Sequence, residues 1–421
     1  MKILTVDIGT GTQDIFLYDS RLDLENGFKL VVPSPTMMVR RRIQDATKHS
    51  LPVLLTGVIM GGGPSAWAAE DHIKAGFPLY ATSSAARSFN DDLEAVREMG
   101  VTILSEDEAL HLLDEVLHIE LRDFDFPAIR RALEVFGVSL DDLDAVAVAV
   151  FDHGDSPPGY SDRQFRFDYL DERIRTENRL SAFAWRRGEI PSIMTRLRAV
   201  EASALDVDAP LVVMDTAPAA VLGATYDPQV AVRPRKLIAN VGNFHTLAFR
   251  LGPGGIEGVF EHHTGLIDRP RLDALLRALA DGSLKHADVF GDMGHGALIY
   301  SSEPLKLGEG DFDVAVTGPR RTLFRTTDDR EQQTAGGRQS TVGGPFLPGN
   351  SLPVPLIPYF AVPFGDMMIA GCFGLLAATA DLFPEFGEKC GLRCVAQAAA
   401  ARPPGKSLKT SHRKGRKERR E

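Results

Sequence analysis

A short segment near the start of the chain combines residue types that bind phosphate. It reads Asp7-Ile8-Gly9-Thr10-Gly11-Thr12 and is followed by Asp14. Glycines and threonines in a tight turn let backbone N–H groups converge on an anion. A carboxylate at the end of the preceding strand can hold a water on Mg²⁺ or bind a sugar-like hydroxyl. The alternative is a plain hairpin. We predict Asp7 as a catalytic and Mg²⁺-binding residue, with phosphate contacts from Gly9, Thr10, Gly11 and Thr12.

A second glycine-bearing segment lies in the other half of the chain and reads Asn240-Val241-Gly242-Asn243-Phe244-His245-Thr246. Strand-like residues flank its glycine, as they flank the first turn. Two such turns that face each other can clamp a triphosphate from both sides. His245 is a candidate catalytic residue that donates to phosphate, and the alternative is a hydrogen-bonded histidine within a core hairpin. The predicted phosphate contacts are Asn240, Gly242, Asn243 and Thr246.

A polar loop, Asp152-His153-Gly154-Asp155, follows the apolar segment 144–151. That segment is apolar enough to be a strand buried on both faces, and ligands of α/β proteins bind at the carboxyl ends of such strands. Asp152 or His153 is therefore a candidate general base that deprotonates an acceptor hydroxyl in phosphoryl transfer. The alternative is a polar turn held by hydrogen bonds between the aspartate and the histidine.

A run of glycines, Gly61-Gly62-Gly63-Pro64-Ser65, precedes a predicted helix. The free N–H groups of a helix start can bind a second anion. Ser65 is an equally good N-cap residue, which is the structural alternative.

The elements that must position these residues alternate between strands and helices. Residues 2–7 and 14–19 read as two antiparallel strands around the first turn, unlike a Rossmann start, where the glycine loop leads into a helix. Residues 236–240 and 244–251 repeat the unit, and residues 52–104 have a βαβαβ rhythm. With 421 residues, the chain is too long for one compact core, so we predict two α/β lobes.

Composition bounds the class of protein. The net charge is −10, which argues against nucleic-acid binding by the body of the chain. A basic tail from about residue 402 is expected to be disordered and is the one segment that could touch nucleic acid weakly. We find no signal peptide and no apolar run long enough to span a membrane, so we expect no membrane partner and a cytoplasmic location.

Cysteine and histidine spacing argues against two kinds of metal centre. A radical S-adenosylmethionine enzyme needs three cysteines at Cys-x₃-Cys-x₂-Cys spacing. Cys390 and Cys394 have one such interval, and no third cysteine follows. The remaining cysteine, Cys372, reads as a small core residue. His262, His263 and His295 lack the spacing of helical metal ligands, so no structural zinc site is expected.

The order of these motifs resembles the superfamily of actin, sugar kinases and heat-shock chaperone ATPases. The resemblance covers roughly residues 1–380 and includes both hairpins and a small-residue segment, 215–223, that links the lobes. It implies a two-lobed actin-like ATPase (ribonuclease H-like) fold that closes on ATP and Mg²⁺. It further implies that Gly318 and Pro319 meet the adenosine, that Asp215 is a second Mg²⁺ residue, and that a Gly/Ala helix follows in residues 365–378.

More narrowly, four segments resemble one prokaryotic family labelled as pyruvate formate-lyase activating enzymes: residues 7–15, 60–64, 151–154 and 240–246. The cysteine spacing does not support that label as chemistry. Asn240 stands where the superfamily usually has an aspartate, and the triple glycine of the second hairpin is missing. An amide cannot replace the charge of a carboxylate that helps to organise Mg²⁺. We therefore expect either that hydrolysis is slow or that the γ-phosphate region receives another ligand, with His245 and Thr246 as donors that could compensate.

These observations predict an α/β chain with a first lobe in residues 1–205, a second lobe in residues 206–385 and a C-terminal extension in residues 386–421. An insertion at about 34–124 in the first lobe is expected, by analogy, to carry substrate specificity. The expected function is an ATP-binding phosphotransferase or ATPase that acts on an unknown small molecule. The alternatives are a nucleotide-dependent switch that controls a partner protein and a metabolite-binding protein that no longer uses nucleotide.

Overall fold

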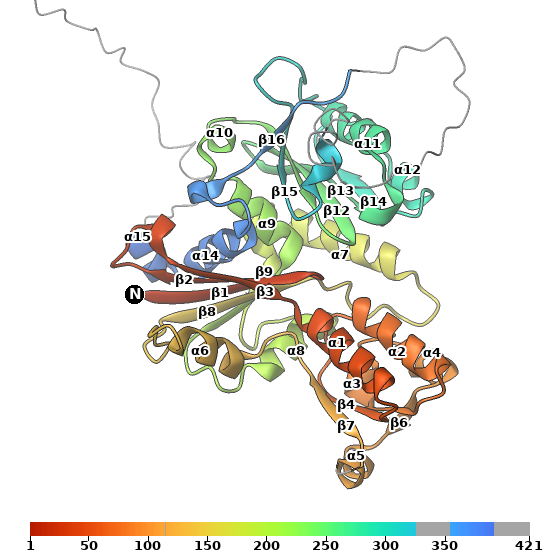
Figure 1. The fold of residues 1–421 in the computed structure, drawn as a ribbon. Helices are drawn as coiled ribbons and strands as arrows, with labels where there is room; N and C mark the ends of the chain where they lie inside the picture. Colours follow the sequence, from red (N-terminus) through yellow and green to blue (C-terminus); the bar gives the residue numbers. More distant parts are fainter. Residues whose placement is uncertain (114, 326–353, 391–421) are drawn as a thin grey trace, which may run out of the picture.

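The computed structural model describes residues 1–113, 115–325 and 354–390, which form two lobes and an inserted subdomain (Figure 1). In the view of Figure 1 the second lobe is at the top, the first lobe is in the middle and the insertion is at the lower right. The predicted disordered tail lies outside the described residues, as does Cys394.

The first lobe is built on a mixed sheet with the strand order β3-β2-β1-β8-β10-β9. β1 and β2 form the predicted antiparallel hairpin, β3 pairs antiparallel with β2, and β8 and β10 run parallel to β1. All six residues of β8 are buried, as its apolar sequence indicates. The strands are β1 (Lys2–Ile8), β2 (Thr12–Asp19), β3 (Phe28–Pro33), β8 (Ala145–Val150), β9 (Ala184–Arg186) and β10 (Leu211–Asp215).

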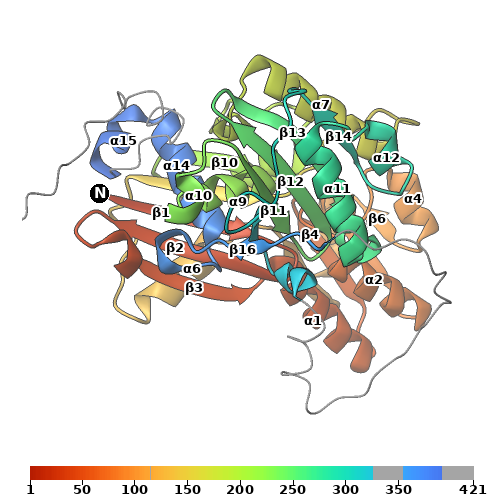
Figure 2. The ribbon, with the colours of Figure 1, turned by 90° about the horizontal axis from the view of Figure 1, so that it is seen from above.

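The second lobe repeats this arrangement in a sheet with the order β14-β13-β12-β11-β15-β16 (Figure 2). β11 and β12 form its antiparallel hairpin, β13 extends the hairpin, and β15 and β16 run parallel to β11. The strands are β11 (Lys236–Val241), β12 (His245–Gly252), β13 (Gly255–His263), β14 (Gly296–Ile299), β15 (Val314–Thr317) and β16 (Pro358–Phe360).

Each sheet thus contains three antiparallel strands followed by two parallel ones, in the orders β3-β2-β1-β8-β10 and β13-β12-β11-β15-β16. This duplicated ribonuclease H-like unit is the two-lobed actin-like ATPase fold, so the predicted fold class is confirmed. The first-lobe sheet extends past the predicted boundary at residue 205, because β10 pairs with β8 along its whole length. The chain therefore enters the second lobe only after Asp215.

Two small-residue helices, α9 (Thr216–Ala224) and α14 (Ala370–Leu382), pack against each other between the lobes (Figure 1). A Cβ atom on Gly223 would lie 1.8 Å from the Ala370 carbonyl oxygen, and one on Gly374 would lie 1.8 Å from the Ala219 carbonyl oxygen. Glycine is required at both positions because the helix backbones approach so closely. The Gly/Ala composition of these segments therefore reflects their packing.

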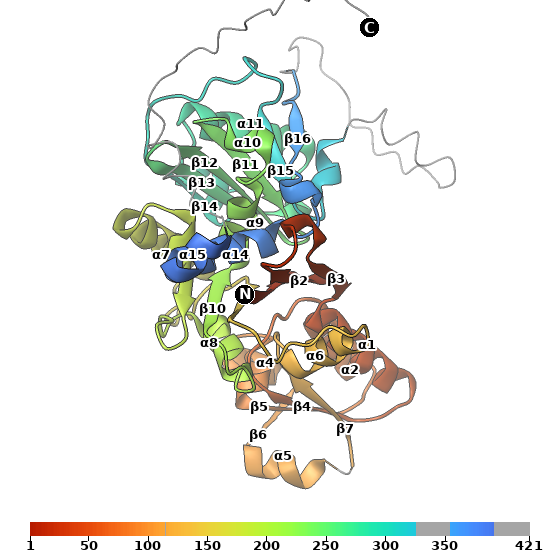
Figure 3. The same cartoon turned by 90° about the vertical axis from the view of Figure 1, so that its left-hand side faces the viewer.

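The insertion has its own parallel sheet, with the order β6-β5-β4-β7, and its own hydrophobic core (Figure 3). Its elements run from residue 35 to residue 121, within the range predicted for the insertion. They are α1 (Pro35–Lys48), β4 (Val53–Gly57), α2 (Pro64–Lys74), β5 (Leu79–Thr82), α3 (Ser83–Ala86), α4 (Leu93–Glu98), β6 (Thr102–Leu104), α5 (Glu106–Leu112) and β7 (Leu117–Leu121).

The remaining helices cover the two main sheets. Within the described ranges, no helix combines the length and apolar character needed to cross a membrane. These helices are α6 (Phe126–Glu134), α7 (Asp162–Thr176), α8 (Thr195–Ser203), α10 (Pro228–Ala231), α11 (Arg269–Asp281), α12 (His286–Phe290) and α15 (Pro384–Cys390).

Candidate functional site

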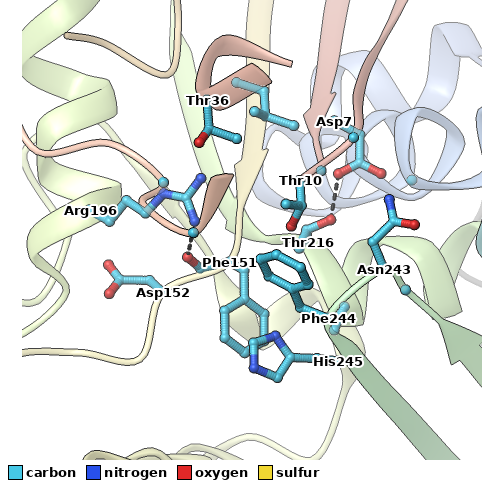
Figure 4. A pocket seen from close by; sticks show the side chains of 18 of the residues that line it. Asp7, Thr10, Thr36, Phe151, Asp152, Arg196, Thr216, Asn243, Phe244 and His245 are labelled. Atoms are coloured by element: carbon cyan, nitrogen blue, oxygen red, sulfur yellow. Dashed lines mark hydrogen bonds between the residues drawn. The ribbon is translucent and has the colours of Figure 1, made fainter. Parts of the chain in front are cut away.

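A cavity of about 440 Å³ lies in the cleft where the two lobes and the insertion meet (Figure 4). This volume is in the range of small-molecule and cofactor sites. Most of the residues that the sequence singles out line it. They are Asp7, Gly9, Thr10, Gly11, Thr12, Asp152, His153, Asn240, Gly242, Asn243, His245, Gly318 and Pro319.

The two glycine turns have the same local closure and face each other across the cleft. In the first, the Gly9 N–H donates to the Thr12 carbonyl over 3.0 Å; in the second, the Gly242 N–H donates to the His245 carbonyl over 2.9 Å. A Cβ atom on Gly11 would lie 2.8 Å from Nδ2 of Asn243. The hairpins of the two lobes therefore approach each other directly.

The second hairpin also contacts the insertion. The ring of Phe244 lies 5.6 Å from the ring of Trp67, centroid to centroid, and a Cβ atom on Gly63 would lie 2.6 Å from the Phe244 ring. Gly63 has a φ of +56° and is the N-cap of α2, so Ser65 is not the cap that the sequence suggested. The glycine run lines the cavity, as an anion site would require.

Two carboxylates on neighbouring strands face the same part of the cavity. Asp7 and Asp14 are directly opposite in the β1–β2 register, and the Thr216 hydroxyl donates to Asp7 Oδ1 over 2.5 Å. Removal from water raises the pKa of Asp7 to about 6 and, with the Asp7 charge nearby, that of Asp14 to about 8. Asp14 Oδ1 is buried and has no hydrogen-bond partner among the described residues. The pair is suited to a divalent cation.

Asp215, the second predicted Mg²⁺ residue, is used differently. Its carboxylate forms a buried ion pair with Arg166, with an oxygen-to-nitrogen distance of 2.6 Å, and accepts the Ala217 N–H at the start of α9. It is not among the residues that line the cavity. The structure therefore corrects the expectation that it holds the nucleotide-bound metal ion, because its carboxylate is bound by Arg166 and the Ala217 N–H and does not line the cavity.

Asp152 lies at the end of β8 and lines the cavity, although its carboxylate also braces the loop. One oxygen accepts the Gly154 N–H and the other accepts the Leu197 N–H, each over 2.9 Å. Burial raises the pKa of Asp152. The predicted polar turn had hydrogen bonds between Asp152 and His153, whereas the partners of this carboxylate are backbone N–H groups. The carboxylate keeps lone pairs for a proton, and the role of Asp152 as a base stays a hypothesis.

The strand end at Gly318 lies beside the second hairpin. Gly318 has a φ of +97°, and a Cβ atom there would lie 2.6 Å from Asn240 Oδ1, so glycine is required. Asn240 lines the cavity, whereas Thr246 does not. The Thr246 hydroxyl is fully buried and pairs with that of Thr264 at 2.9 Å, which corrects the prediction that it contacts phosphate.

Asp14, Thr216 and Arg196 are among the polar residues of the cavity to which sequence reasoning gave no site role. Asp14 belongs to the first motif, and its place opposite Asp7 follows from the hairpin register. Arg196 forms an ion pair with Asp123 at 2.7 Å and donates to the Phe151 carbonyl over 2.7 Å (Figure 4). Nothing in the sequence around Arg196 marks it, because its partners are distant in the chain.

His153 and His245 lie together at the wall of the cavity. The His245 ring stacks on Phe151 with centroids 4.3 Å apart (Figure 4), and His153 packs against it edge-on at 5.4 Å. Burial holds the pKa of both imidazoles well below their usual value. Both rings are therefore neutral near pH 7 and can accept through a ring nitrogen.

Several solved structures are similar to this chain. A ROK hexokinase from Thermus thermophilus matches with 14% identity, 69% of this chain and 64% of that chain covered, and a TM-score of 0.24. An exopolyphosphatase-like protein matches with 12% identity, 77% and 67% covered, and a TM-score of 0.25. A Listeria monocytogenes protein described as "a putative N-acetylmannosamine kinase" matches with 10% identity, 91% and 100% covered, and a TM-score of 0.32. At these TM-scores, the fold assignment depends on the sheet order itself.

Among curated proteins, none matches the chain in sequence. A family model does match, over residues 60–323, which is more than half of the chain. The matched region contains the glycine run, the loop after β8 and the whole second hairpin. The chain therefore belongs to the family described as "Putative pyruvate format-lyase activating enzyme (DUF1786)".

Proposed function

We propose that the protein is a Mg²⁺- and ATP-dependent phosphotransferase that acts on a small molecule. The observation that carries the proposal is the direct approach of Gly11 and Asn243 from opposite lobes, beside the Asp7–Asp14 pair. A triphosphate needs donors on both sides and a divalent cation against its oxygens. This arrangement offers all of these within one cavity.

The residues of the cleft fit Mg²⁺ and ATP. Asp14 Oδ1, which has no partner in the part of the chain that the structure describes, is a buried acceptor that a cation or its bound water would satisfy. Asp7 and Asp14 would hold Mg²⁺, which neutralises phosphate charge, and ATP would supply the phosphoryl group. Gly318 and Pro319 lie at the end of β15 beside the second hairpin and would contact the adenosine.

The acceptor would bind on the side of the insertion. Arg196 and the glycine run at residues 61–63 line that wall of the cavity. Asp123 accepts from both Arg196 and the Gly61 N–H, so the backbone N–H groups of Gly62 and Gly63 are the candidate donors to the acceptor. Asp152, on the neighbouring loop, is our candidate for the base that takes the acceptor proton. We prefer it to His153, because His153 Nε2 is engaged with His295 Nε2 at 3.3 Å. Use of ATP is consistent with a cytoplasmic location.

One feature favours a second function, a nucleotide-dependent switch that acts on a partner protein. Asn240 provides an amide where a carboxylate would help to organise Mg²⁺ and water, and it lines the cavity. Slow turnover with tight binding would let ATP bias lobe closure without being consumed quickly. Radical chemistry is not proposed, because the cysteines lack the spacing that an iron–sulfur cluster requires.

Nucleotide binding and turnover in the full chain test both functions. We expect Mg-ATP to raise the melting temperature and Asp7→Ala to lose both this rise and any phosphoryl transfer to a panel of metabolites. Asp45→Ala, on the exposed face of α1, is the matched control. Binding without turnover would favour the switch. No stabilisation by any nucleotide with Mg²⁺ would contradict both functions.

A further inference from the structure

Four side chains with metal-binding atoms meet at the wall of the cleft. They come from the loop after β8 (His153), the start of β12 (His245), the middle of β13 (Glu261) and the residue before β14 (His295). Their ligand atoms all lie within 4.8 Å of one another. The proposed nucleotide site uses none of the four, and no spacing in the sequence relates them.

The distances inside the cluster fit one small cation. His153 Nε2 and His295 Nε2 are 3.3 Å apart, and His295 Nε2 is 3.6 Å from Glu261 Oε1. A tetrahedral ion with bonds of ~2.0–2.1 Å sets neighbouring ligand atoms about 3.4 Å apart. Two of the distances between ligand atoms are already close to this value. The longest separation, 4.8 Å, requires a small side-chain adjustment.

One buried oxygen of the cluster is an acceptor that a cation would satisfy. Glu261 is fully buried, and its Oε1 has no hydrogen-bond partner within the described ranges, although Oε2 accepts from Arg166 Nε over 2.8 Å. An unpaired buried carboxylate oxygen is costly. Stacking of the imidazole rings explains why the histidines lie together, but it does not explain why Glu261 Oε1 is buried without a hydrogen-bond donor in the described ranges.

The charge around the cluster also permits a cation. Arg166 contacts Glu261, but its other arm forms an ion pair with Asp215 at 2.6 Å. Arg166 and its two carboxylate partners together carry a net charge of −1, and Arg163 adds a further positive charge near His295. Arg166 also fixes the orientation of the Glu261 carboxylate, as hydrogen-bonding groups behind a metal ligand commonly do.

We propose that His153, His245, Glu261 and His295 bind one divalent transition-metal ion such as Zn²⁺. Three imidazoles and one carboxylate are the donors that such ions prefer over Mg²⁺. His153 belongs to the first lobe and the other three residues to the second, so the ion joins the lobes across the cleft. Metal binding therefore stabilises the closed arrangement of the lobes, independently of nucleotide.

Metal titration of the full chain after removal of bound ions by a chelator tests this site. We expect one equivalent of Zn²⁺ per chain, and visible absorption bands typical of tetrahedral coordination when Co²⁺ is used instead. His295→Ala should weaken the Zn²⁺ affinity by about 100-fold or more. Loss of a residue that only hydrogen-bonds to a metal ligand is expected to weaken it by about 10–100-fold. His118→Ala is the control, because His118 is a half-buried, hydrogen-bonded histidine of the insertion.

A second measurement guards against variants that fail to fold. Circular dichroism should show that His153→Ala and His295→Ala keep the secondary structure, and Zn²⁺ should raise the melting temperature of the parent chain but not of these variants. The proposal is overturned if the parent binds no Zn²⁺ or Co²⁺. It is also overturned if a folded His153→Ala/His295→Ala double variant binds either ion as tightly as the parent.

Discussion

The cleft contains two polar clusters that differ in chemistry and in origin. Asp7, Asp14 and Thr216 present oxygen atoms, and the two carboxylates lie on adjacent strands of one hairpin. The imidazole cluster of His153, His245 and His295, with Glu261, presents mainly nitrogen and comes from distant segments. Oxygen donors select Mg²⁺, whereas imidazoles select transition ions. The two proposed sites would therefore sort two cations by donor type.

The two clusters also differ in which lobes supply their residues. Asp7 and Asp14 both belong to the first-lobe sheet, so a cation there does not need the second lobe as a protein ligand. The imidazole cluster needs residues from both lobes. Lobe opening should therefore release the transition ion but leave the carboxylate pair intact.

Gly371→Ala is expected to give the largest difference between the effect on the Asp7–Asp14 pair and the effect on the imidazole cluster. A Cβ atom on Gly371 would lie 1.8 Å from Asp7 Oδ2, so α14 or the carboxylate must move. Overpacking of this kind costs ~1–3 kcal/mol, and displacement of Asp7 should remove Mg-ATP stabilisation. Calorimetry with Mg-ATP and, separately, with Zn²⁺ measures both sites. Gly254→Ala, where a Cβ meets open space, is the control. Equal loss at both sites would contradict their independence.

A smaller effect is expected from Gly11→Ala. The added Cβ would lie 2.8 Å from Asn243 Nδ2, the end of a flexible side chain, so the hairpins separate slightly. We expect ATP affinity to fall by about tenfold, which is ~1.4 kcal/mol, with Zn²⁺ affinity unchanged. Fluorescence titration with a nucleotide analogue measures the change. The double variant Gly11→Ala/Asn243→Ala should recover part of it, and unchanged affinity in the single variant would show that the hairpins do not grip the nucleotide.

The smallest effect is a pH dependence of opposite sign at the two clusters in metal-free protein. The pKa of Asp14 is raised from 3.8 to about 8, so the folded state holds more protons and its stability falls as pH rises across that window. Burial lowers the pKa of His295 from 6.5 to about 2, so stability there is complete above pH 6.5 and falls as pH drops below it.

Asp14→Asn should therefore remove a decline in stability between about pH 6.5 and pH 8. The decline is at most about 1.4 kcal/mol per pH unit, reduced by the partial exposure of the side chain. Urea denaturation with a chelator present measures it, and Asp45→Asn should keep the slope of the parent chain. A slope that survives in Asp14→Asn would assign the decline to another group.

Local patterns predicted the parts of the site that depend on near neighbours in the chain. The two glycine turns, their flanking strands and the small-residue helices α9 and α14 all follow from residue types within a few positions. A glycine turn between apolar strands has few other conformations, so its geometry is local. The prediction that the hairpins of Gly11 and Asn243 lie opposite each other depended on the resemblance to the actin-like superfamily. Neither hairpin sequence by itself indicates it.

Other predictions required distant contacts and did not fit the structure. Asp215 reads as a metal residue until Arg166 is found beside it, and Thr246 reads as a phosphate donor until it pairs with Thr264. The first-lobe boundary at residue 205 is too early, because β10 joins a sheet whose other members are far away in the chain. In each case a partner at long sequence separation decides what the side chain does.

The amino-acid sequence determined the turns, the alternation of strands and helices and the choice of Asp7 as a central residue, because these depend on backbone preferences and short-range burial patterns. Tertiary structure decided which polar side chains share a space. The imidazole cluster shows this most clearly, since His153 and His295 are 142 positions apart yet place their Nε2 atoms 3.3 Å from each other. Such proximity arises only when packing of the two lobes brings separate strand ends together.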